Sequence, residues 1–89
     1  MKQIAAIVKD TRSTRQANLR DFATELGVSH MTVSLWENGK ADPSPEVVGK
    51  LLASSVPWIK DMGLDIYAAQ QRQTMSNALP NLTTITSQP

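Results

Sequence analysis

Hydrophobic residues recur along the first 62 residues at the three-to-four-residue spacing of amphipathic helices, and short polar segments separate the runs. Ile4, Ile7 and Val8, for example, give the first run one apolar face. Val47 and Leu51 do the same in the fourth run. The pattern predicts five helices, over residues 2 to about 13, 19 to 26, 30 to about 38, 45 to about 52, and 57 to about 62.

The ends of these predicted helices carry residues that commonly cap helices. Asn18, Ser29 and Ser44 can each accept a hydrogen bond from a backbone N–H in the first turn of the helix that follows. Gly27 and Gly39 follow the second and third helices, where the left-handed conformation is easiest for a residue without Cβ. The sequence therefore places the limits of the second and third helices closely.

The pattern weakens after residue 62. Gly63 is expected to interrupt the fifth helix, and residues 64–79 to form a sixth helix with a weak apolar patch at Ile66, Tyr67, Ala68 and Ala69. Residues 80–89 are polar and lack periodicity, so we expect them to be disordered or ordered only by a partner. The sequence predicts an all-α protein with a compact domain of five or six helices. Its parts are a domain over 1–62, a helical extension over 63–79 that can serve dimerisation, and a tail over 80–89.

Residues 18–39 carry the most informative pattern. They form two short predicted helices joined by a turn at Gly27, and Ala23 is small enough for the two helices to cross closely. Val33 and Trp36 lie three apart and are expected to face the preceding helix. This arrangement is typical of helix-turn-helix units, whose second helix enters the major groove of DNA. An amphipathic hairpin inside another kind of bundle is the alternative interpretation.

The same segment resembles the helix-turn-helix of the lambdoid phage repressors and Cro, the XRE-like family. About 50 residues, from Ile4 to Leu52, can be aligned with the helices of that family. The resemblance implies a lambda-repressor-like fold in which the third helix lies in the major groove. It rests on nine residues at the family's relative spacing: Ala23, Gly27, Val28, Ser29, Val33, Trp36, Glu37, Asn38 and Gly39.

The resemblance also implies roles for individual residues. The side chains directed at base edges would be His30, Met31, Ser34 and Leu35. Phosphate contacts would come from the backbone N–H groups that begin the second helix, together with Asn18, Arg20, Thr32, Asn38 and Lys40. Met31 and Leu35 depart from the polar residues usual in the family, and they suit either thymine methyl groups or a protein partner.

Glu37 is expected to serve structure. It stands where the family has a carboxylate paired with an arginine of the first helix; Arg12 is the first choice for its partner and Arg15 the second. Trp36 is expected to pack inward, which leaves it unsuited to stacking on a base.

Composition and charge add two points. The chain has 89 residues, enough for one domain, and no cysteine, so a disulfide framework or zinc site is not expected and a reducing cytoplasm is the natural location. No apolar run is long enough for a membrane span. Net charge is only +1, but residues 1–20 carry five basic and one acidic residue, a charge of +4. This basic end can attract phosphate, although a solvated charged face is the alternative.

Enzyme activity is not expected, and neither is a cofactor or a metal. The chain has no glycine-rich phosphate loop, and its single histidine, His30, has no neighbouring cysteine or paired acid. Asp61 and Asp65 are four residues apart, but they flank Gly63 and suit capping or solvation better than catalysis.

The preferred functional hypothesis is sequence-specific binding of double-stranded DNA by a bacterial or phage transcriptional regulator that acts as a homodimer. The fifth helix and residues 64–79 are the candidate dimer surface, and the same C-terminal segment can also bind a protein partner. One alternative is a phage packaging or replication protein that marks a DNA site. Another is a protein-interaction module that has lost DNA binding.

Overall fold

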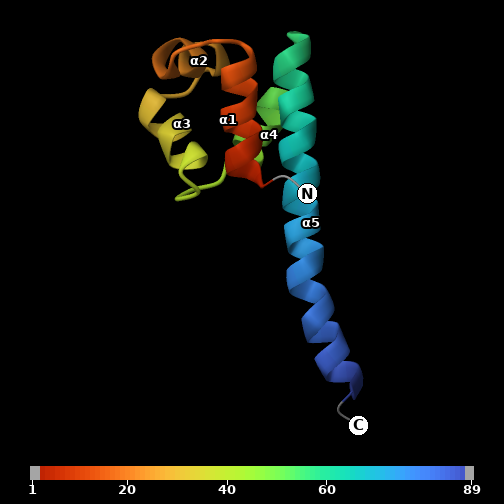
Figure 1. The fold of residues 1–89 in the computed structure, drawn as a ribbon. Coiled ribbons are helices and arrows are strands. Elements are labelled where there is room, and N and C mark those ends of the chain that lie inside the picture. The colour runs from red at the N-terminus through yellow and green to blue at the C-terminus, as the bar shows by residue number, and fades with distance from the viewer. Residues whose placement is uncertain (1–2, 88–89) are drawn as a thin grey trace.

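The computed structural model describes residues 3–87, with side chains for residues 3–72. Over that part of the chain the secondary structure is entirely helical. Figure 1 shows α1 between α3 and α5, with α4 behind it, and α5 extending well beyond the other helices. The predicted all-α fold is confirmed. The five helices are α1 Ile4–Thr14, α2 Leu19–Leu26, α3 His30–Glu37, α4 Pro45–Leu52 and α5 Pro57–Ser87.

Side-chain caps begin three of these helices, as predicted. Asn18 Oδ1 accepts from the amide of Asp21 at 2.8 Å at the start of α2. Ser29 and Ser44 play the same role for α3 and α4, with Oγ accepting at 3.1 Å and 3.2 Å. Each cap satisfies a backbone N–H that has no partner inside its own helix, which is worth about 1 kcal/mol per cap.

Three helices end on a residue in the left-handed conformation. Gly27 after α2 has φ 75°, Gly39 after α3 has φ 69°, and Gln16 after α1 has φ 54°. After α1 the backbone N–H of Gln16 donates to the carbonyl of Ser13, and the backbone N–H of Ala17 donates to the carbonyl of Arg12. These two hydrogen bonds are those of a Schellman motif. Glycine fits this position without strain, whereas Gln16 holds a Cβ in the conformation that L-residues rarely adopt.

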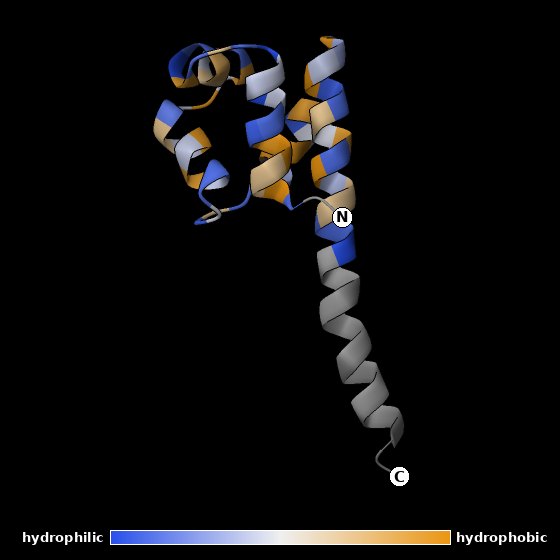
Figure 2. Cartoon of the chain, in the orientation of Figure 1, coloured by the Kyte–Doolittle hydropathy of each residue, from blue (hydrophilic) through white to orange (hydrophobic). Residues whose placement is uncertain are grey.

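The hydrophobic core is drawn from all five helices, and Figure 2 shows hydrophobic and hydrophilic residues alternating along α1 to α4, as amphipathic helices require. Met62, Ile66 and Ala69 of α5 belong to this core. Residues 63–70 therefore pack with the helices before them, since Gln70 Nε2 also donates to the carbonyl of Pro43 at 2.8 Å, and only the part of the expected extension after Gln70 can form a separate segment. The other buried members are Ile4, Ile7, Val8, Phe22, Ala23, Val33, Trp36, Val48, Leu51 and Ile59.

Gly63 does not interrupt the fifth helix, so the prediction of a break there, and of a separate sixth helix, is wrong. α5 runs through Gly63, which is buried where α4 crosses. A Cβ at this position would lie 2.8 Å from Leu51 Cβ and 3.2 Å from the backbone nitrogen of Leu52. Glycine is therefore present for the close approach of two helix backbones.

The weak apolar patch predicted after Gly63 is divided by the helix. Ile66 and Ala69 point into the core, whereas Tyr67 lies on the exposed side with Leu64. The backbone of α5 also includes residues 80–87, where the sequence predicted a tail. The side chains of that segment lie outside the described residues, so the expectation of a disordered tail remains a prediction.

Candidate nucleic-acid interface

The packing between α2 and α3 fixes the position of the second helix. Ala23 of α2 and Val33 and Trp36 of α3 are all buried, and the backbone turns between the two helices at Gly27. The amide of Val28 donates to the carbonyl of Ala23 at 3.0 Å, which closes the end of α2 before α3 begins. One side of α3 is thereby held in the core and the opposite side is left outward.

The outward side of α3 carries the residues predicted to face bases. His30 is exposed, Met31 is 67% exposed and Leu35 is 43% exposed, while Ser34 is half-buried. Met31 and Leu35 are four residues apart, so they lie one above the other on the same face. The structure brings the four side chains to one surface and sets Val33 and Trp36 on the other side of the helix.

Most polar side chains on and beside this surface already have partners within the helix. Asn38 Nδ2 donates to the carbonyl of Ser34 at 2.8 Å and to its Oγ at 3.3 Å. The hydroxyl groups of Ser29 and Thr32 share a hydrogen bond of 2.8 Å. Within the part of the chain that the structure describes, the His30 side chain makes no hydrogen bond, so His30 is the polar group on this face that is ready to bind a base.

The predicted phosphate contacts fall into two groups. Arg20 and Lys40 are exposed cations on either side of α3 in sequence, and they are able to reach a DNA backbone. Asn18 is occupied as a cap, and its Nδ2 also donates to the carboxylate of Asp21 at 3.1 Å. Asp21 has no place among the predicted contacts, yet its negative charge in the first turn of α2 opposes a phosphate there. The signal in the sequence is that Asp21 directly follows Arg20 and offsets its positive charge.

Glu37 forms the ion pair that the sequence predicted. Arg12 Nε donates to Oε2 of Glu37 at 2.7 Å, and Nη2 donates to Oε1 at 2.9 Å. Glu37 is 8% exposed, which makes it the buried charged residue among those described. The hydrogen bond to Glu37 raises the pKa of Arg12 above its ordinary value, against the opposing effect of burial. The pair joins α1 to the end of α3.

Arg15, the second choice for that pair, has other contacts. Its guanidinium carbon lies 4.0 Å from the centroid of the Trp58 ring, a cation–π distance. It also reaches Glu25 of α2 at 3.4 Å. Trp58 in turn stacks on Phe22, with 5.5 Å between ring centroids. These contacts link the end of α1, α2 and the start of α5.

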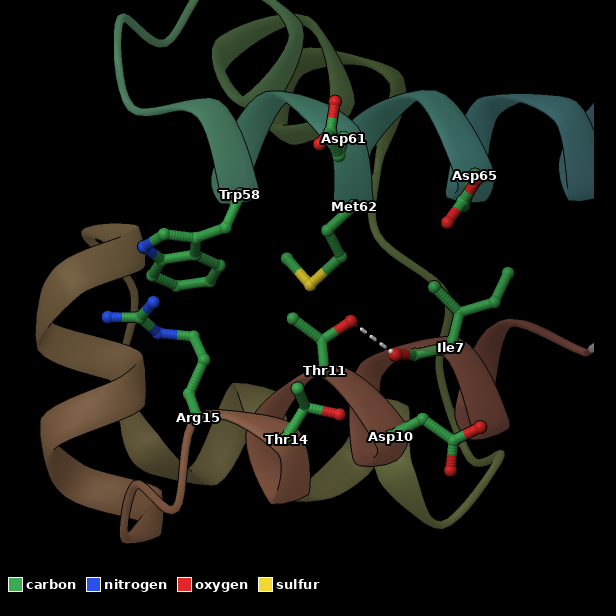
Figure 3. Close-up of a pocket in the computed structure, with 9 residues that line it drawn as sticks. All are labelled: Ile7, Asp10, Thr11, Thr14, Arg15, Trp58, Asp61, Met62 and Asp65. Atoms are coloured by element: carbon green, nitrogen blue, oxygen red, sulfur yellow. Dashed lines mark hydrogen bonds between the residues drawn. The ribbon is translucent and has the colours of Figure 1, made fainter.

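A groove of about 270 Å³ lies between α1 and α5, on the side of α1 opposite α3 (Figure 3; Figure 1). Ile7 and Met62 contribute buried apolar side chains to it. Its lining also includes three carboxylates, Asp10, Asp61 and Asp65. Arg15 is the one cation in the lining, so the charge at this groove is negative on balance and disfavours phosphate, and the α3 side is the candidate interface.

Two other classes of site receive no support from the described residues. No group of three or more His, Cys, Asp or Glu side chains among them is arranged to hold a metal ion. In the same part of the chain, no helix combines the length and the apolar character needed to cross a bilayer.

Comparison with known proteins agrees with the geometry of α2 and α3. A family model described as helix-turn-helix matches residues 14–53, which contain α2, α3 and α4. Comparisons with curated proteins and with solved structures gave no match. The matched family is one of DNA-binding regulators. Residues 14–53 of this chain are therefore similar to the XRE-like, lambda-repressor-like helix-turn-helix family, and α2 and α3 supply the two helices of that motif.

Proposed function

We propose that this protein is a transcriptional regulator that binds a specific double-stranded DNA sequence as a homodimer, with α3 in the major groove. The observation that supports this most is the division of α3 into two sides. Val33 and Trp36 hold it against the domain, and His30, Met31 and Leu35 stand out from the surface. A helix held rigidly on one side and exposed on the other is what entry into the groove requires.

Base contacts are assigned to His30, Met31, Ser34 and Leu35, because these side chains share the outward surface of α3. Phosphate contacts are assigned first to Arg20 and Lys40, which are exposed and cationic. Asn18, Thr32 and Asn38 have a smaller part, because their side chains are already engaged in hydrogen bonds near the helix ends. We expect about 3 to 5 phosphates to be neutralised per protomer.

The dimer is assigned to the exposed side of α5. Leu64 and Tyr67 are three residues apart on this helix and are 50% and 48% exposed. Two-fold pairing of this surface would place two reading helices on a palindromic site, which doubles the base contacts of a small domain. The cytoplasm is the proposed location, and the proposal includes no catalytic step and no cofactor.

Selection of bound duplexes from a random-sequence DNA pool tests the function, with sedimentation of the free protein and of the complex to test the dimer. We expect an enriched palindrome with half-sites about one helical turn apart. Leu64→Asp combined with Tyr67→Asp is expected to give a monomer that binds the palindrome weakly. Val56→Asp, which changes an exposed apolar residue before α5, is the matched control and should remain dimeric.

The alternatives predict different results in the same experiments. A ring-like oligomer bound to one DNA site would favour the packaging or replication hypothesis. Failure to enrich any sequence at low and at moderate salt would contradict DNA recognition and favour the protein-interaction module.

A further inference from the structure

We infer that α3 recognises its DNA mainly through the C5-methyl groups of thymine, so that the base pairs facing Met31 and Leu35 are A·T pairs. This inference rests on the proposed DNA-binding function and names the chemistry that the reading surface recognises. It is drawn from three properties of α3: which side chains are exposed, which polar groups are already bound, and how small the apolar surface is.

The first property is the apolar character of the protruding side chains. Met31 is the most exposed of the large hydrophobic residues described, and Leu35 lies one turn further along the same face. Neither side chain can donate or accept a hydrogen bond of useful strength to a base edge. In the major groove the thymine methyl is the apolar group that base pairs present, whereas the other distinguishing groups are donors and acceptors.

The second property is the engagement of the neighbouring polar groups. The Ser34 hydroxyl and the Asn38 amide are joined to each other, and the Thr32 hydroxyl is joined to Ser29. A base contact by any of these would require an existing hydrogen bond to be shared or exchanged. His30 remains for one polar contact, so two of the three large side chains that α3 exposes, Met31 and Leu35, are apolar.

The third property separates DNA from a protein as the occupant of this surface. A specific protein interface buries about 800 Å² on each partner, which requires a cluster of residues. Among the side chains of residues 3–72, which the structure describes, the other large exposed hydrophobic residues are Val56, Leu64 and Tyr67, and they belong to α5 or to the segment just before it. α5 lies across α1 from α3 (Figure 1), so Met31 and Leu35 are set apart from those three residues. Two side chains suit two methyl groups better than a protein partner.

The experiment replaces thymine by deoxyuridine in the selected duplex, one position at a time and symmetrically in both half-sites. This substitution removes only the C5-methyl and keeps base pairing and groove hydrogen bonds. We expect Kd to rise about fourfold for each methyl removed that is in contact, the change that corresponds to burial of one methyl-sized group. At a position that Met31 contacts, Met31→Ala should bind the thymine and deoxyuridine duplexes equally, and Leu35→Ala should do so at a different position.

Lys40→Ala is the matched control, because it removes a phosphate contact from the same protein. It is expected to weaken binding to the thymine and deoxyuridine duplexes equally and to keep the fourfold difference between them. Both alanine variants of α3 change exposed side chains, and far-ultraviolet circular dichroism checks that each is folded.

Each other outcome overturns a stated part of the inference. Equal binding of thymine and deoxyuridine duplexes by the parent protein, with a specific palindrome still selected, would overturn methyl recognition and leave the proposed function standing. Deoxyuridine sensitivity that persists in both alanine variants would overturn the assignment of methyl contacts to Met31 and Leu35. Absence of any specific site would overturn the proposed function and this inference together.

Discussion

Arg12 of α1 donates two hydrogen bonds to the carboxylate of Glu37, from Nε at 2.7 Å and from Nη2 at 2.9 Å. The two residues are 25 positions apart in sequence, and the contact fixes the last turn of α3 against the first helix. Two parallel hydrogen bonds constrain orientation as well as distance. The direction in which α3 presents its outer side is therefore set by this pair as well as by the packing of Val33 and Trp36.

Removal of either partner should destabilise the domain, but to different extents. Arg12→Met leaves a buried carboxylate without its cation, and we expect the free energy of unfolding to fall by about 2 to 4 kcal/mol. Glu37→Gln should cost less, because the Arg12 side chain is 27% exposed and keeps a hydrogen bond to the carbonyl of Ala17. Urea denaturation followed by circular dichroism measures both. Equal losses would contradict the asymmetry.

The exposed pair between Arg15 and Glu25 provides the control for that comparison. Its charged atoms are 3.4 Å apart and both side chains are more exposed than Glu37. Glu25→Gln is therefore expected to change the free energy of unfolding by no more than about 1 kcal/mol.

Gly63→Ala should destabilise the protein although alanine favours helix formation. The new Cβ would meet Leu51 Cβ at 2.8 Å, and relief of that contact requires α4 and α5 to move apart. We expect a loss of about 1 to 3 kcal/mol in the free energy of unfolding, as for other overpacked cores. Thermal denaturation and urea titration provide the measurement.

Gly49→Ala is the matched substitution, because Gly49 lies within α4 and a Cβ there would have no heavy atom within 4 Å. It should stabilise the protein by roughly 0.5 to 1 kcal/mol through helix propensity alone. Stabilisation by both substitutions would show that the helices do not cross as closely at Gly63 as the structure has them.

Gln16→Gly should stabilise the domain. Gln16 has φ 54°, and it stands where α2 and α3 use Gly27 and Gly39. Relief of the left-handed strain is worth about 1 kcal/mol, less the larger backbone entropy that glycine has in the unfolded chain. Gln16→Ala keeps the Cβ and is expected to leave the melting temperature nearly unchanged. A lower melting temperature for Gln16→Gly would mean that the glutamine side chain contributes more than its backbone conformation costs.

The salt dependence of DNA binding should distinguish the assigned phosphate contacts from other surface charges. Arg20→Ala and Lys40→Ala are each expected to reduce the slope of log K against log salt concentration by about one per protomer, since one phosphate contact is lost. Lys50→Ala removes the same charge from α4 and should leave the slope unchanged. A similar reduction for all three variants would indicate a general electrostatic effect and would count against the assigned contacts.

Local signals explain why so much of the fold could be predicted from the sequence. The limits of α2 agree with the structure residue for residue, and α3 ends one residue before the predicted Asn38, because caps and helix-ending glycines act within a few residues. α1 extends from Ile4 to Thr14 rather than from about residue 2 to 13. It has no side-chain cap at Gln3 to mark its start.

The features that the sequence did not predict depend on residues distant along the chain. A glycine that interrupts a helix and a glycine that lets two helices cross have the same local appearance, and only Leu51 beside Gly63 distinguishes them. The sequence ranks Arg12 before Arg15 as the partner of Glu37, and the structure agrees because Arg15 packs on Trp58, a residue 43 positions further along the chain. The assignment of base and phosphate contacts remains a prediction, since it requires the DNA.

The exposure of Met31 and Leu35 has a consequence for how many genomic sites such a protein would occupy. A polar side chain that hydrogen-bonds a base edge rejects a wrong base strongly, because its buried donor or acceptor is left unsatisfied. An apolar side chain in contact with a thymine methyl loses only the burial of that methyl group when the base changes. The difference in binding free energy between the right and a wrong base is then small at each position, and related DNA sequences bind with similar affinity. A regulator built on this surface would respond in a graded way to a set of imperfect operators, ordered by their number of correctly placed thymines, rather than to one site alone.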